Sequence, residues 1–100
     1  MPHRLTVTIP GNIQPLERGA RFADPLDQAL KVAALGEIGD EGTQMGVVDG
    51  RLGIIAADIE VTVSDLDSGL ALIRKVLKAA GAPAATTITQ REPIVVVHPL

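Results

Sequence analysis

Near the middle of the chain stands Val47-Val48-Asp49-Gly50-Arg51-Leu52, in which an Asp-Gly pair is flanked by β-forming residues. Such a pair is the favoured two-residue turn of a β-hairpin, because both turn positions need a positive φ. After the turn, apolar residues alternate from Ile55 to Val63, which is the two-residue period of a strand with one buried face. The pattern predicts one long hairpin over Glu37–Val63.

The outgoing strand of this hairpin cannot be regular along its whole length. Counting the register back from the turn places Asp40 opposite Ile59 on the apolar face. Burying a carboxylate there without a partner is costly. We therefore expect a bulge near Gly39 or Gly42, which would turn Asp40 away from that face.

The elements before the hairpin are a strand, a loop and a helix. Residues 5–9 alternate apolar and threonine side chains, which predicts a strand. Residues 12–22 contain a proline and a glycine and are expected to form an irregular loop. Asp24-Pro25 is typical of a helix start, with Asp24 as the cap and Pro25 in the first turn. This helix is expected to end at Gly36.

The elements after the hairpin are a second helix and two strands. Ser64 or Asp65 is expected to cap the helix, and a weak strand is predicted over Thr86–Gln90. Ile94–Val97 is apolar at every position and predicts a strong final strand. One shared core is expected, made of Leu5, Val7, Leu30, Ile59, Val61, Leu70, Ile73 and Leu77.

The order strand, helix, strand, strand, helix, strand, with an extra strand at the end, predicts an α+β fold. Two amphipathic helices would cover one face of an antiparallel sheet. This order resembles the ferredoxin-like βαββαβ architecture, which hosts many unrelated functions and implies no particular activity. The 100 residues are expected to form a single domain over 1–100.

The charge distribution is uneven although the formal net charge is only −3. Residues 36–68 hold eight carboxylates and one arginine. Such a segment repels phosphate and attracts cations or a basic partner surface. The alternative is an ordinary solvated surface that pairs with the basic second helix. Phe22 is the only aromatic residue, so base-stacking platforms are lacking and no nucleic-acid binding is expected.

Metal and redox chemistry have little support in the sequence. There is no cysteine, which excludes disulfides, thiolate catalysis and the usual structural zinc sites. His3 and His98 would meet only if the first and last strands were neighbours, and neither has a carboxylate beside it. The glycines at 36, 39 and 42 lack the dinucleotide-binding spacing. We expect no metal and no cofactor.

No catalytic set stands out either. Asp58 and Glu60 share one face of a strand, but no histidine accompanies them, and a solvated sheet face explains them better. An enzyme that encloses a cavity on the face of Asp58, Glu60 and Thr62 remains a third possibility. No apolar run approaches the roughly 18 residues of a membrane span. With no export signal, a cytoplasmic protein is expected, and the scarcity of lysine and asparagine is typical of GC-rich bacterial coding.

These observations favour a non-enzymatic protein-interaction domain. Its concrete form would be an inhibitor or immunity-type protein with an acidic surface that binds a basic partner. The alternative is a small-ligand-binding regulatory domain, with the glycine-rich hairpin base supplying backbone donors. A homodimer through the apolar final strand is also expected. The candidate interaction residues are Asp40, Glu41, Asp58, Glu60, Ile94 and Val96.

Overall fold

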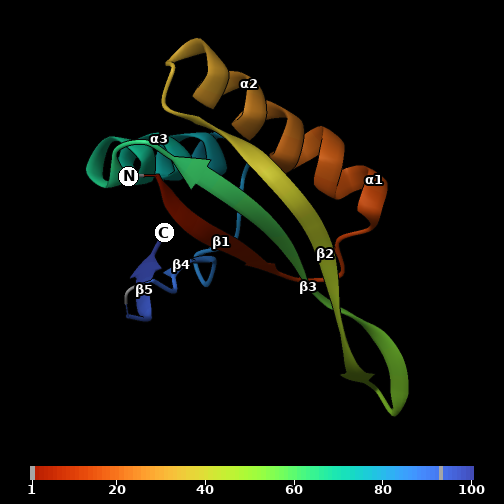
Figure 1. The fold of residues 1–100 in the computed structure, drawn as a ribbon. Coiled ribbons are helices and arrows are strands. Elements are labelled where there is room, and N and C mark those ends of the chain that lie inside the picture. The colour runs from red at the N-terminus through yellow and green to blue at the C-terminus, as the bar shows by residue number, and fades with distance from the viewer. Residues whose placement is uncertain (1, 93) are drawn as a thin grey trace.

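A computed structural model describes residues 2–92 and 94–100 of the chain (Figure 1). Within these residues, five strands form one antiparallel sheet in the order β2-β3-β1-β4-β5. The elements are β1 (His3–Pro10), α1 (Pro15–Glu17), the π-helical segment η1 (Arg18–Ala23), α2 (Asp24–Val32), β2 (Gly36–Val48), β3 (Arg51–Val63), α3 (Leu66–Ala79), β4 (Thr87–Gln90) and β5 (Val96–Pro99). The expected α+β class is confirmed.

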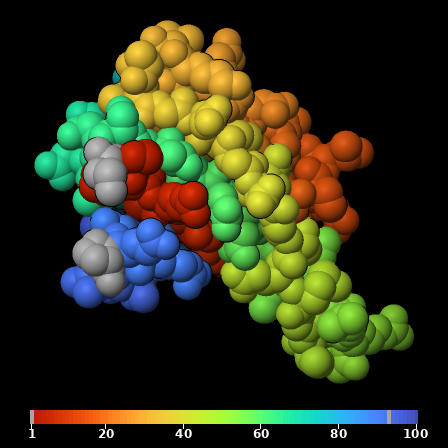
Figure 2. Space-filling model, viewed as in Figure 1, coloured from red at the N-terminus to blue at the C-terminus, as the bar shows by residue number. Residues whose placement is uncertain are grey.

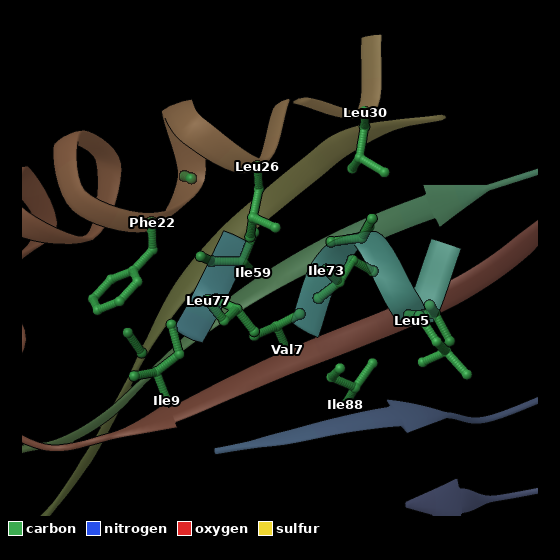
Figure 3. Close-up of a cluster of buried hydrophobic side chains, with 14 of the residues drawn as sticks. Leu5, Val7, Ile9, Phe22, Leu26, Leu30, Ile59, Ile73, Leu77 and Ile88 are labelled. Carbon is green, nitrogen blue, oxygen red and sulfur yellow. The ribbon is translucent and has the colours of Figure 1, made fainter. Parts of the chain in front are cut away.

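The core lies between the sheet and the two longer helices, α2 and α3 (Figure 3). All eight residues expected in one core are buried together there. Phe22, Leu26 and Ile88 also belong to the cluster. Burial of such side chains is the main stabilising contribution of a fold this size. In the described part of the chain, none of the helices combines the length and apolar character needed to cross a bilayer.

The predicted hairpin is confirmed as β2 and β3. Asp49 and Gly50 both have positive φ, at 51° and 76°, as the two-residue turn requires. The predicted bulge is present, because the register shifts between Ile38 and Glu41. A second shift, which was not expected from the sequence, lies between Gln44 and Met45 and leaves one extra residue in β3.

The expected loop over residues 12–22 is wrong, since Pro15–Val32 is one continuous helical run. Pro15 occupies the first helical position that was predicted for Pro25, so the helix begins ten residues earlier than expected. Asp24 lies inside this run and is not its cap. Its N–H donates to the carbonyl of Gly19, five residues back. This wider π turn accommodates Pro25, which lacks an N–H and whose ring crowds the preceding turn of a regular helix.

The helix ends before Gly36, contrary to expectation. Ala34 takes the left-handed conformation with φ 53°, and the Leu35 N–H donates to the Leu30 carbonyl at 2.9 Å. Gly36 begins β2 instead. A Cβ there would lie 1.9 Å from the Thr62 carbonyl oxygen, so close strand approach explains this glycine.

Of the two candidate caps for α3, Asp65 is confirmed. Its Oδ2 accepts the Ser68 N–H at 2.8 Å. The weak strand before the C-terminus is confirmed as β4, but the final strand begins two residues later than predicted. β5 pairs with β4 from Val96 to Pro99, and the Arg74 Nε donates to the Pro99 carbonyl at 3.0 Å.

Candidate interaction surface on the open sheet face

The side of the sheet turned away from α2 and α3 is called the open face below. Side chains alternate between the two faces along each strand, so those that do not point into the core point to the open face. One row crosses the sheet by facing positions: Glu60 lies opposite Thr6, Thr6 opposite Thr89, and Thr89 opposite Val97. The row passes from an acidic side chain through threonines to an exposed apolar one.

Two of the predicted acidic residues meet on this face. Asp40 and Glu60 line one hollow of about 490 Å³, at the end of the sheet where β2 has its first bulge. Within the described residues, neither carboxylate takes part in an ion pair. The structure therefore brings together two negative charges that remain available to a ligand or partner.

Asp58 lies one row further along the same face and is held in place. Its Oδ1 accepts the Thr8 hydroxyl at 2.8 Å. The Gln44 Nε2 donates to both of its carboxylate oxygens at 3.0 Å. These bonds come from the two neighbouring strands, β1 and β2, and fix the position of the charge without neutralising it.

The open face is not uniformly acidic. Arg4 and Arg91 line the same hollow as Asp40 and Glu60, together with Thr6 and Thr62. Leu5 pairs with Gln90, which places Arg4 and Arg91 next to each other on neighbouring strands. Alternation along β1 shows that Arg4 shares a face with Thr6. The presence of Arg4 on the open face could therefore have been predicted from the sequence. A sum of charges over whole segments does not reveal it.

Glu41 lines a smaller hollow of about 270 Å³ on this face with Asp40, Asp58 and Glu60, but its side chain turns the other way. It lies opposite the buried Ile59, on the helix-facing side of the sheet. Its Oε1 accepts the Arg18 Nε at 3.1 Å, and the Arg18 side chain is only 12% exposed. The first bulge separates Glu41 from Asp40, its neighbour in sequence, and sends the two carboxylates to opposite faces.

The apolar candidates lie at the far edge of the sheet from the acidic ones. Val96 is half-buried and faces the helix side, because it pairs with Gln90, which lies opposite the buried Leu5. Ile94 is exposed and precedes the strand. The structure therefore does not bring Ile94 or Val96 together with Asp58 and Glu60.

The two histidines are not neighbours. His98 pairs with Ile88 of β4, which separates β5 from β1, while His3 pairs with Val63 at the end of β1. Over residues 2–92 and 94–100, no group of three or more His, Asp or Glu side chains is placed to hold a metal ion.

In comparisons with known proteins, no family model matches this chain, and no curated protein sequence matches it significantly either.

Proposed function

We propose that this chain is a protein-interaction domain whose open face binds a partner with a basic surface. The observation that carries the proposal is the meeting of Asp40 and Glu60 in one hollow without an ion pair between described residues. Asp58 adds a third carboxylate, held by Thr8 and Gln44. Fixed charges on a rigid sheet attract a partner of opposite sign without a large ordering cost.

We propose a ferredoxin-like arrangement for the first four strands and the two longer helices. It is supported by the order β2-β3-β1-β4 with every neighbouring pair antiparallel, to which β5 adds at one edge. In such a layered fold the helices occupy one face only. The opposite face is then the natural place for recognition, as in an inhibitor or immunity-type protein that occupies a basic cleft.

The test is a nuclear magnetic resonance titration with a short oligolysine peptide as the basic probe. The proposal expects amide shifts to gather on the open-face strands and to vanish in the double variant Asp40→Asn, Glu60→Gln. A matched control, Asp24→Asn with Asp67→Asn, also removes two exposed carboxylates but from the helices, and should keep the shifts. Shifts that gather around α2 and α3, or that persist in the first double variant, contradict the proposal.

A small-ligand regulatory domain is the second candidate, and one observation favours it. Arg4 and Arg91 stand beside each other with two threonines in the same hollow, whose volume is within the range of small-molecule sites. Adjacent guanidinium groups suit a carboxylate or phosphate. Stabilisation by a dicarboxylate or an amino acid in a thermal-shift assay, lost in Arg4→Gln, would favour this candidate over the first.

A further inference from the structure

The distal part of the β-hairpin, residues 45–55, projects from the body of the protein and is called the hairpin arm (Figure 2). The pairing of β1 with β3 ends at Pro10 and Ala56, and one further bond joins the Gly11 N–H to the Ile55 carbonyl at 2.8 Å. Beyond that point, β2 and β3 pair only with each other in the described chain. A two-stranded ribbon is marginally stable alone in water, so this arm needs further contacts.

One face of the arm is entirely apolar. Met45 lies opposite Ile54, and Val47 lies opposite Leu52, so these four side chains share a face. Val47 is 76% exposed and Leu52 is 75% exposed. This face continues the helix-facing side of the sheet, but it lies beyond the helices that cover the core. Contiguous exposed apolar surface of this kind usually marks a contact site.

The outer edge of β2 is protected along only half of its length. Residues 36–41 carry three carboxylates and a bulge, which are devices that prevent strands from pairing at an edge. Gly42–Val48 has no charged side chain and no proline. The other edge strand, β5, is four residues long and ends at Pro99. The unprotected edge of the sheet is therefore Gly42–Val48, which runs onto the arm.

We propose that two copies of this chain pair antiparallel through Gly42–Val48 of β2 and form a dimer. A strand that pairs antiparallel with itself generates a two-fold axis, so the same surface is used twice and the assembly closes. With Met45 at the axis, Thr43 of each copy lies opposite Val47 of the other. The two arms then make a four-stranded ribbon with a continuous apolar face. Backbone groups of this edge that pair with no strand find partners, while the Gly42 carbonyl already accepts a bond from Arg18.

In this register Glu41 of one copy comes opposite Asp49 of the second copy. Arg18, which is bonded to Glu41 on the same face, supplies a positive charge beside these two acids. Arg18 contacts the Gly42 carbonyl and the Thr43 hydroxyl, so the tip of the second copy arrives beside Arg18.

The composition of the tip argues against a bilayer as the occupant. Insertion of the arm would carry Asp49 and Arg51 into the hydrocarbon first, and charged groups are costly there. A dimer through β5 would have only a short strand to pair. This inference goes beyond the proposed open-face function and is independent of it. The dimer uses the outer edge of β2 and the apolar face of the arm, and neither belongs to the open face.

The first test compares Val47→Lys with Val97→Lys by light scattering over a dilution series. Both variants place a lysine on an exposed valine of an edge strand, one in β2 and one in β5. We expect a wild-type dimer, a dissociation constant raised at least about tenfold by Val47→Lys, and no change with Val97→Lys. A wild-type monomer at millimolar concentration, or the reverse order of the two variants, overturns the proposal.

A second test uses the absence of cysteine in the sequence. Met45→Cys, at the axis, is expected to form an intermolecular disulfide with oxidised glutathione, whereas Val97→Cys is expected to remain mostly reduced. Circular dichroism checks that each variant stays folded. If neither Met45→Cys alone nor an equal mixture of Thr43→Cys and Val47→Cys cross-links in a wild-type-like dimer, the interface lies elsewhere and the proposal is wrong.

Discussion

The Arg18 guanidinium reaches across from η1 to β2 and bonds Glu41 Oε1 at 3.1 Å, the Gly42 carbonyl at 2.9 Å and the Thr43 hydroxyl at 2.8 Å. One side chain thus ties the irregular part of the helical run to the bulged strand. The Glu41 carboxylate, which the bulge places on the helix side, is paired there rather than left as an isolated charge.

We expect Arg18→Leu to lower the free energy of unfolding by about 1–3 kcal/mol, because it leaves Glu41 and the Gly42 carbonyl without this partner. Glu41→Gln should cost less, and a double-mutant cycle in urea should give a coupling of about 1 kcal/mol. The control pair is Arg21 with Glu17, which is largely exposed and should couple by only about 0.3–0.5 kcal/mol. Equal coupling of the two pairs would contradict this explanation.

Ala34→Gly is expected to stabilise the protein by about 0.5–1 kcal/mol. Ala34 holds the left-handed conformation at the end of α2, where an L side chain is disfavoured and glycine is not. Ala33, its neighbour, has φ −80°, and glycine at that position should destabilise the protein. Opposite shifts of the thermal midpoint in the two variants are the expected result, and a decrease in both would refute it.

Gly36→Ala is expected to cost about 3 kcal/mol or more, since the new methyl group meets the Thr62 carbonyl and forces β2 and β3 apart. Gly42→Ala serves as the control, because among the described residues no atom outside its chain neighbours lies within 4 Å of the position that its Cβ would take. Chemical denaturation distinguishes the two. If both glycines tolerate alanine equally, close strand approach is not the reason for Gly36.

The decrease in the free energy of unfolding at acid pH, called the acid limb below, should depend on Asp65. The Ser68 N–H bond holds the pKa of the Asp65 carboxyl below its ordinary value of 3.8. A folded-state pKa below the unfolded one means that the stabilisation is present above about pH 4 and is lost as the pH falls through the folded value. Asp27 has the same sign, because Lys31 and the Ile38 N–H lower its pKa.

Asp65→Asn keeps a capping oxygen but removes the titration, so the dependence of unfolding on pH below about pH 4 should become flatter. Asp67→Asn lies in the same first turn of α3, where the described structure shows no such bond for residue 67. It should leave the acid limb close to that of the wild type. A flatter limb in Asp67→Asn alone would contradict the assignment.

The hairpin was predictable because its determinants are local. Asp49-Gly50 specifies the turn, and the conflict between Asp40 and Ile59 specifies a bulge. The helical run was not predictable in the same way. Pro15 and Pro25 each suit a first helical position, and the choice between them depends on the burial of Phe22, which is a tertiary effect.

The candidate surface was predictable only in part. Asp58 and Glu60 share a face by simple alternation, and Asp40 joins them through the predicted bulge. Glu41 was expected beside them. However, a bulge that turns the Asp40 side chain to the open face leaves the side chain of the next residue, Glu41, on the helix side. The Arg18 contact that receives Glu41 spans 23 residues and depends on the unpredicted η1.

The two bulges lie in opposite strands of the hairpin, one adding a residue to β2 and the other adding a residue to β3. Their effects on the register cancel, so Gly36 faces Val63 in the same alignment that the turn would impose on a regular ladder. The stretch between them, Glu41–Gln44, is aligned by the sheet and not by the turn. Arm length and sheet geometry are thereby uncoupled: adding or removing one facing pair of residues beyond Met45 changes the reach of the arm and leaves the open face as it is.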